Sequence, residues 1–484
     1  NVVQPLGGLR RLGSTMSRLA YEVDLGSRIH GAFTELFDNN PNMVDDILAH
    51  VGLENCSALS KEITAKATDC LRKVLVENCP TFQHVPGTEK VPVNVELLDH
   101  WRTAAKDPDP EPVQWLKTGA PAGILIPVVD RGIFPTYDPC LDVVEVLPDD
   151  LYTSDGFVNY PGIDGDPDID KEVGRILDSD YASTYETVEE AERVLGGRII
   201  LSKIGAVKKW KNFVLKMRMV IDSKESGVSR ATRKHERTQL PRASDVVKDV
   251  MGLLAPFLGR ADLDAVLEFL IADFRDAFFI MPNHPQERRF FAVWWNGKVL
   301  VFTKTTQGSR GAPLTWARLA ALVTRLTQSV IGLAHSRIST YVDDPIVAAV
   351  GSRSVRRRVF ATTLALWSAL GLPLSLNKAQ IGKCVTWTSA VFTPTPKGID
   401  VSVKEVIVRE TLELCERFLS QNYVTRKDLR TYIGKAMHIA SLVVTVRPFI
   451  TELYAALHDT TRSGPTSHSI WTRQIKHSID YMLI

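Results

Sequence analysis

The sequence predicts an α+β protein, because strand patterns and helical patterns alternate through its second half. Residues 213–222 alternate between apolar and polar side chains, as a half-buried strand does. Two β-prone runs flank the adjacent pair Asp343 and Asp344, which predicts a hairpin with both carboxylates at its tip. Apolar residues then recur at helical spacing over 355–370 and 406–419. Hairpins combined with helices are typical of the α+β class.

The composition is that of an ordinary globular protein. The chain has 484 residues, of which 44% are apolar and 24% charged, and this length suits two or three domains. Its six cysteines form no CxxC pair, which argues against a disulfide framework and a structural zinc site. The first thirty residues contain four arginines and no apolar core, so we expect no secretory signal.

One uncharged stretch, 359–377, approaches the length of a membrane span. Its apolar residues follow helical spacing and polar residues interrupt it, which favours a half-buried amphipathic helix followed by a break. We therefore expect an intracellular protein of the cytoplasm or nucleus that contacts no membrane. The oligomeric state is not predicted.

The distribution of charge predicts a boundary near residue 196. Residues 131–190 contain 16 acidic and 3 basic side chains, a net charge of −13, whereas 201–250 contain 13 basic and 5 acidic ones, a net charge of +8. The basic block is either a surface that faces a polyanion or an ordinary solvated face. We expect a mostly helical or irregular region of unpredicted role over 1–195, a second unit over 196–400 and a helical unit over 401–484.

Within the first region, the pattern predicts a helix over 57–78 and a linker rich in Asp and Pro over 107–112. In the last unit, helical patterns cover 406–419 and 426–442, and Thr425 with Asp428 forms a capping box before the second of them. A further helix is expected after Arg447 and Pro448.

A carboxylate ends the first buried strand of the central unit. Apolar residues from Val266 lead up to Asp273, and burial of a carboxylate there is unfavourable unless a cation compensates it. Taken alone, Asp273 is better explained as a cap of the next helix. The Asp343–Asp344 pair, about 70 residues later, is by itself explained equally well as a turn. Together, however, the three carboxylates suit two divalent ions of the kind that catalyse nucleotidyl transfer.

These segments, in their order and spacing, resemble the palm motifs of reverse transcriptases from LTR, DIRS-like and retroviral elements. The resemblance covers about 203–457. The matching segments are 218–222, which is similar to the fingers motif, and 273–279, 307–313, 341–344, 372–378 and 385–387, which are similar to successive palm motifs. The resemblance implies a right-hand polymerase with fingers, palm and thumb and a ferredoxin-like antiparallel palm. The region 401–484 would be the helical thumb or connection.

The resemblance also implies roles for individual residues. Asp273, Asp343 and Asp344 would be catalytic and would bind two Mg²⁺ ions, with Mn²⁺ as a possible substitute. The expected nucleotide-binding residues are Lys211, Arg218, Asp276, Ala277, Phe278, Gln307, Gly308 and Lys378. The expected primer- and template-binding residues are Tyr341, Trp387, Arg426, Lys427, Arg430 and Lys435. The partners would be an RNA or DNA primer–template and deoxynucleoside triphosphates.

The favoured function is that of an RNA-directed DNA polymerase of a mobile genetic element, which adds deoxynucleotides to a primer 3′-end by a two-metal mechanism. Two alternatives remain: a catalytically decayed retroelement protein that only binds nucleic acid, and an RNA-dependent RNA polymerase. Phe278 argues against the second, because an aromatic ring would exclude a 2′-hydroxyl. Pro345 departs from the family, which usually has an aliphatic residue after the acidic pair. The segment Trp387-Thr388-Ser389 departs from it as well.

Overall fold

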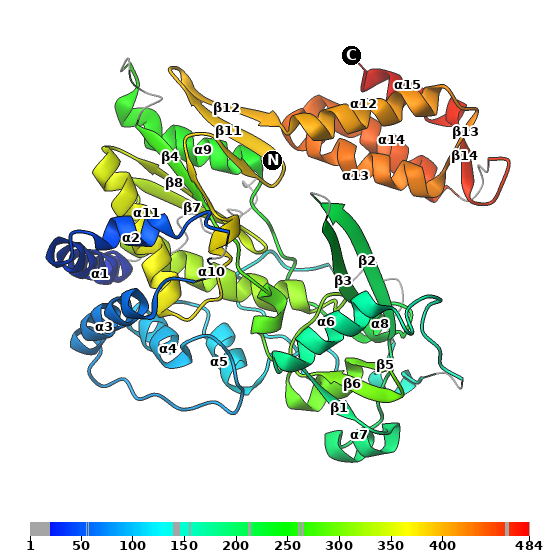
Figure 1. The fold of residues 1–484 in the computed structure, drawn as a ribbon, viewed down its shortest axis with the longest axis horizontal. Coiled ribbons are helices and arrows are strands. Elements are labelled where there is room, and N and C mark those ends of the chain that lie inside the picture. The colour runs from blue at the N-terminus through cyan, green and yellow to red at the C-terminus, as the bar shows by residue number, and fades with distance from the viewer. Residues whose placement is uncertain are drawn as a thin grey trace, which may run out of the picture.

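The computed structural model describes residues 20–54, 56, 58–138, 146–153, 156–211, 214–259, 262, 266–459 and 464–483. At 20–23, 209–211 and 214–216 it describes the backbone only. Helices and strands mix along the described chain (Figure 1). The helices are α1 (Ala20–Asn39), α2 (Met43–Ala49), α3 (Lys61–Asn78), α4 (Val95–Ala104), α5 (Glu111–Thr118), α6 (Pro167–Asp178), α7 (Val188–Leu195), α8 (Val228–Ala231), α9 (Ala243–Leu254), α10 (Ala312–Ile331), α11 (Arg353–Ala369), α12 (Glu405–Leu419), α13 (Arg426–Leu442), α14 (Arg447–His458) and α15 (Lys476–Tyr481).

Within the described residues, the strands form five small antiparallel sheets. They are β1 (Ala182–Tyr185), β2 (Lys203–Lys211), β3 (Val214–Asp222), β4 (Leu267–Ile271), β5 (Ala292–Trp295), β6 (Lys298–Phe302), β7 (Ser336–Tyr341), β8 (Asp344–Val350), β9 (Gln380–Gly382), β10 (Val385–Trp387), β11 (Ala390–Thr395), β12 (Gly398–Val403), β13 (Tyr423–Thr425) and β14 (Ser469–Trp471). The predicted mixture of helices and antiparallel strands is confirmed.

The central sheet has four strands in the order β7-β8-β4-β9. Along the chain its elements follow as β4-α10-β7-β8-α11-β9, and every neighbouring pair in the sheet is antiparallel. This β-α-β-β-α-β sequence is the ferredoxin-like arrangement. It places the end of β4 beside the turn between β7 and β8.

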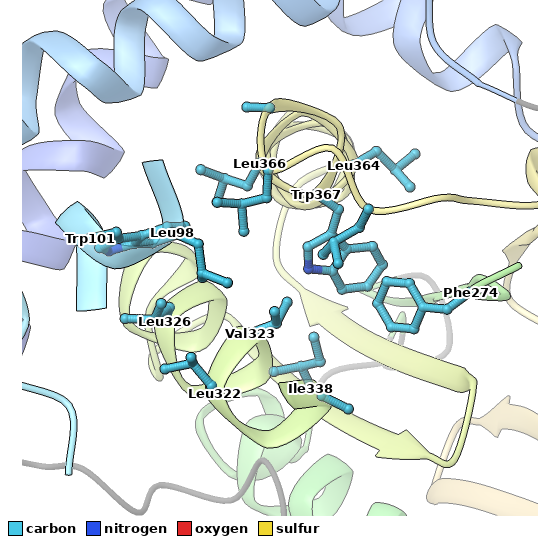
Figure 2. Packing of buried hydrophobic residues seen from close by; sticks show 14 of the residues in the cluster. Leu98, Trp101, Phe274, Leu322, Val323, Leu326, Ile338, Leu364, Leu366 and Trp367 are labelled. Atoms are coloured by element: carbon cyan, nitrogen blue, oxygen red, sulfur yellow. The ribbon is translucent and has the colours of Figure 1, made fainter. Parts of the chain in front are cut away.

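Both faces of the central sheet are buried, and alternate residues of a strand belong to different cores. On β4 and β8, Leu270 and Val347 point to the core beneath α10 and α11, while Phe269 and Ile346 point to the core beneath α9 and the β10–β12 sheet. Figure 2 shows the first of these cores, in which Ile338 of β7 lies beneath side chains of α10 and α11.

The N-terminal helices share this first core with the central sheet. Side chains of α1 to α5 belong to the same buried cluster as those of α10 and α11, and α1 and α3 contact α10 and α11 directly. In Figure 2, Leu98 and Trp101 of α4 lie beside Leu326 of α10. The first core therefore combines side chains from both sides of residue 196.

Of the predicted linker over 107–112, only 107–110 lies between helices, because α5 begins at Glu111. Asp107 and Asp109 are buried, and each forms an ion pair with two hydrogen bonds to an arginine of α10. Asp107 pairs with Arg325, and Asp109 pairs with Arg318. The Arg318 side chain is fully buried and also lies 4.7 Å from the ring of Trp115. Local composition gave no sign of this burial, because the arginines that pair with the segment are about 210 residues away.

A second lobe contains the β2–β3 hairpin, the β1-β6-β5 sheet and α6. Here the acidic and basic blocks neutralise each other in part. Lys208 of β2 forms ion pairs with Asp166 and Asp168 at the start of α6. The basic block is therefore not simply a free cationic surface.

The C-terminal helices α12 to α15 and the β13–β14 pair form a bundle with a core of its own. The predicted helices of this unit are confirmed, and the Thr425 hydroxyl caps α13 by accepting from the backbone N–H of Asp428 at 3.0 Å. The bundle contacts the rest of the protein through β12 and α9. Among the described helices, none is long and apolar enough to cross a membrane.

Candidate active site

The β7–β8 hairpin turns tightly at the predicted acidic pair. Tyr341 pairs with Asp344, so Val342 and Asp343 form the two-residue turn. Val342 has a φ of +53°, which a β-branched residue rarely adopts. Such a conformation persists only where its surroundings hold it.

The backbone of this turn is held by three elements. Three consecutive carbonyl oxygens each accept a hydrogen bond from a different part of the chain: α10, the segment after β4, and β10. The donors are Trp316 Nε1 to Val342 O at 2.7 Å, Phe274 N to Asp343 O at 2.8 Å, and Trp387 Nε1 to Asp344 O at 2.9 Å. The bonds fix the backbone that carries Asp343 and Asp344.

The same contacts bring Asp273 to the turn. Asp273 lies two residues after the end of β4, and its carbonyl accepts the backbone N–H of Ser375 at 2.8 Å. Because the next residue, Phe274, donates to Asp343, the end of β4 and the hairpin tip lie against each other. The structure thus brings the three sequence-predicted carboxylates into one place.

The electrostatics of the site are those of carboxylates without enough counter-charge. Burial, and then the negative charges of Asp343 and Asp273, raise the pKa of Asp344 to about 6. Burial also raises the pKa of Asp343, and the charge of Asp273 adds to that rise. No salt bridge to Asp343 or Asp344 occurs among the described side chains.

Two cations approach the carboxylates from different elements. Lys378 Nζ lies 2.8 Å from Asp273 Oδ2 and is half-exposed. Arg218 is exposed on β3, and its charge, with that of Lys378, opposes the rise in the pKa of both hairpin carboxyls. The site therefore combines three acidic groups with two cations that remain accessible.

The residues present suit a divalent cation by their chemistry. Carboxylate oxygens are ligands that Mg²⁺ prefers, and bound metal would remove the repulsion that raises the pKa values here. In the described part of the chain, however, no three Asp, Glu, His or Cys side chains already stand close enough together to hold a metal ion. The backbone places the three carboxylates in one region, and their oxygens would have to move closer together to bind a cation.

The segment after Asp273 is shaped by an ion pair that sequence reasoning missed. Asp276 has a φ of +51°, and its Oδ2 accepts a hydrogen bond from Arg175 Nη1 of α6 at 3.0 Å. Ala277 is buried, and Phe278 is half-buried against the first core. No local signal pointed to Arg175, because it lies about 100 residues away within the acidic block.

The Gln307–Gly308 loop is joined to the end of β3. The Gln307 carbonyl accepts the backbone N–H of Ile221 at 3.0 Å, and the Gly308 carbonyl accepts from the Ser223 hydroxyl. Gly308 has a φ of +99°, and a Cβ there would lie 1.9 Å from the Ile221 carbonyl oxygen. Only glycine permits this approach, so the loop lies directly against β3, the strand that carries Arg218.

The predicted primer and template residues fall into two groups. Trp387 is 1% exposed and anchors the hairpin tip, while the exposed Tyr341 contacts its ring edge-on at 6.1 Å between centroids. Arg426 donates to carbonyls at the end of α14, and Lys435 pairs with Glu410. Only Lys427 and Arg430 of this set are exposed cations with no ion pair among the described side chains. Their roles in binding stay predictions, and the side chain of Lys211 lies outside the described residues.

Pro345 fits its place in the hairpin. It is the second residue of β8, pairs with Thr340, and its carbonyl accepts the backbone N–H of Ala272 at 3.1 Å. Because β4 ends at Ile271, the missing N–H of the proline falls where the pairing with β4 stops.

No protein-family model and no curated protein matches the sequence. Solved structures are similar to it at low identity. The foamy viral protease-reverse transcriptase in complex with an RNA/DNA hybrid matches with a TM-score of 0.45 and 17% identity, over 84% of this chain and 49% of that one. The foamy viral protease-reverse transcriptase dRH with double-stranded DNA has a TM-score of 0.44 and 17% identity, over 84% and 63% of the two chains. A third structure, also with double-stranded DNA, has a TM-score of 0.45 and 14% identity, over 92% and 71%. This chain spans about half the length of the first.

Proposed function

We propose that the protein is a nucleotidyltransferase, an RNA-directed DNA polymerase of a mobile genetic element. One observation carries the proposal: three carboxylates are gathered at and beside a hairpin tip whose backbone is fixed by three hydrogen bonds, and they lack sufficient counter-charge. A structural cluster would be neutralised by arginines. A site that waits for metal and triphosphate keeps the charge uncompensated and the backbone fixed.

Asp273, Asp343 and Asp344 would hold two Mg²⁺ ions, for which Mn²⁺ could substitute. Such ions, when bound, activate the primer 3′-hydroxyl and stabilise the leaving pyrophosphate. Arg218, together with Lys211, would bind the triphosphate, since β3 brings Arg218 close enough to act on the hairpin carboxyls. Lys378 would move from Asp273 to the pyrophosphate as the metal replaces it.

In this proposal the three parts of the molecule correspond to a right hand. The β2–β3 lobe would be the fingers, the ferredoxin-like sheet the palm, and the C-terminal bundle the thumb. Lys427 and Arg430 would contact the phosphates of a primer–template, because they are exposed cations on α13. The partners would be a primer–template of RNA and DNA and deoxynucleoside triphosphates.

Primer extension by the purified chain tests the catalytic proposal. We expect Mg²⁺-dependent extension on an RNA template, and a loss of at least about 10³-fold in Asp273→Asn and Asp343→Asn, since Asn keeps the shape and removes the charge. The exposed Asp400 of β12 supplies the matched control, Asp400→Asn, which should extend normally. Salt-sensitive binding of primer–template without extension by the wild-type chain would instead identify a decayed, nucleic-acid-binding protein.

The choice of sugar separates a DNA polymerase from an RNA polymerase, and it depends on Phe278. A ring packed beneath the sugar excludes a 2′-hydroxyl, and the half-buried side chain is accessible enough to do so. In Phe278→Val we expect ribonucleotide use relative to deoxynucleotide use to rise about tenfold, which corresponds to about 1.4 kcal/mol. Unchanged discrimination with normal deoxynucleotide incorporation would mean that Phe278 serves the core alone.

A further inference from the structure

Helix α6 lies in the acidic block, for which the sequence predicted no role. It packs beside β3, as Figure 1 shows, and its buried face belongs to the core of the second lobe. That face consists of Ile169, Val173 and Ile176. The helix is therefore a fixed part of the lobe that carries Arg218.

The N-terminal end of α6 is fastened to the β2–β3 hairpin. Asp166 caps the helix by accepting the backbone N–H of Asp168 at 3.0 Å. Lys208 of β2 donates to both carboxylates, at 2.5 Å to Asp166 Oδ2 and 3.0 Å to Asp168 Oδ2. The hydrogen bond to Lys208 lowers the pKa of Asp166, so this attachment is charged at neutral pH.

The last turns of α6 are fastened to the segment after Asp273. Arg175 donates from Nη1 to Asp276 Oδ2 at 3.0 Å, and its Nε and Nη2 donate to the two oxygens of Glu172 at 2.9 and 2.7 Å. Glu172 thus holds the guanidinium in the orientation in which it meets Asp276. Just after the helix, the ring of Tyr181 stacks on Phe279 at 4.6 Å.

Asp276 needs such support because its backbone is left-handed. A non-glycine residue in this conformation costs about 1 kcal/mol or more. The Asp276 carbonyl then accepts the backbone N–H of Phe279 at 2.8 Å and starts the short 3₁₀ turn 277–280 that presents Phe278. The direction of Phe278 therefore depends on the conformation of Asp276.

We propose that Arg175 is a positioning residue for the nucleotide-binding segment 276–278, and that α6 is a strut between this segment and the β2–β3 hairpin. The inference rests on the proposed polymerase function and assigns a part of that function to the acidic block. Arg175 does not touch the nucleotide. It holds the floor of the nucleotide pocket at a fixed place relative to the hairpin that supplies Arg218.

The first test separates binding from chemistry. In Arg175→Gln we expect the KM for deoxynucleotides to rise about five- to tenfold with kcat within about twofold, since the partly exposed hydrogen bond to Asp276 is lost with the two to Glu172, while Asp273, Asp343 and Asp344 are untouched. Arg175→Lys should restore part of the loss. Lys171→Gln is the matched control, because Lys171 is an exposed cation of the same helix. Asp276→Asn should resemble Arg175→Gln, and the double variant should be no worse than either single one.

The second test needs no catalysis. Hydrogen–deuterium exchange of the ligand-free chain should speed up in peptides covering 275–281 in Arg175→Gln and stay unchanged in Lys171→Gln, at equal melting temperatures. Faster exchange in a chain that extends no primer would refute the polymerase proposal and leave the positioning role standing. Unchanged exchange, a lowered kcat with unchanged KM, or a similar effect in Lys171→Gln would overturn the inference.

Discussion

Two groups of aspartates in this protein differ in the positive charges that surround them. Asp107 and Asp109 are buried, and each forms an ion pair with the guanidinium group of an arginine from α10. Asp273, Asp343 and Asp344 face one lysine at contact distance, and the pKa values of the two hairpin carboxyls are raised. The first group is complete within the chain. The second keeps negative charge that the described side chains do not balance, and in the proposed function a bound cation would balance it.

An Asp→Asn substitution should change the stability of the protein differently in the two groups. Asp109→Asn leaves Arg318 buried without its main partner, so we expect the free energy of unfolding to fall by about 3–5 kcal/mol. Asp343→Asn removes a repelled charge, so stability should stay unchanged or rise. Chemical denaturation of both variants in the absence of metal measures this contrast. A marked loss of stability in Asp343→Asn would remove the distinction.

Added Mg²⁺ should stabilise the folded protein through the second group of aspartates alone. At a free Mg²⁺ concentration about 100-fold above its Kd, the folded state gains about 2.7 kcal/mol, which thermal unfolding detects. We expect that gain in the wild-type chain and in Asp400→Asn, but not in Asp343→Asn. An equal rise of the melting temperature in all three proteins would place the metal elsewhere.

The pH dependence of stability sharpens the comparison further. Because the folded-state pKa of Asp344 is raised to about 6, the native state binds the extra proton between about pH 4 and 6. Stability contributed by this group is therefore lost as pH rises through that window. After allowance for the partial exposure of Asp344, we expect the free energy of unfolding to fall by about 1 kcal/mol across this window. The variant Asp344→Asn should lack this fall. Denaturation curves at pH 4.5 and 7 test the sign; a rise of stability across the window due to Asp344 would contradict it.

The smallest effect is expected at Pro345. If the three carbonyl hydrogen bonds fix the hairpin tip, the restricted φ of the proline adds little to the geometry. Pro345→Val should then lower the free energy of unfolding by about 0.4–1 kcal/mol, mainly through the unfolded chain, and leave extension within about twofold. A large gain or loss of extension would show that the proline itself sets the position of the carboxylates.

Local patterns sufficed for much of the fold. The end of β4, the acidic hairpin and helices α12, α13 and α14 lie where periodicity and capping residues predicted them, because these elements depend on neighbours in the chain. The gathering of Asp273 with Asp343 was predicted by combining a strand-end carboxylate with an acidic hairpin, and it is seen in the geometry. The activity of the site stays a prediction.

What sequence reasoning missed depends on partners far along the chain. The burial of Asp109 was missed because nothing near it in the sequence points to Arg318, and Arg175 lay in the acidic block, for which the sequence predicted no role. Trp387 was expected at the primer, and its burial against the hairpin could not be read from three local residues. Long-range ion pairs and indole hydrogen bonds have no periodic signature.

The core that joins the N-terminal helices to α10 and α11 has a consequence for how the protein is made. Its N-terminal contributors end near residue 134, the next come from 270–281, and those of α10, which packs against α1, start near residue 314. At a synthesis rate of about 5–20 residues per second, the apolar faces of α1 to α5 would wait roughly 10–40 s on the ribosome for their partners. A nascent chain in that interval is a substrate for chaperones, and truncation before α10 should yield aggregates rather than a folded N-terminal fragment.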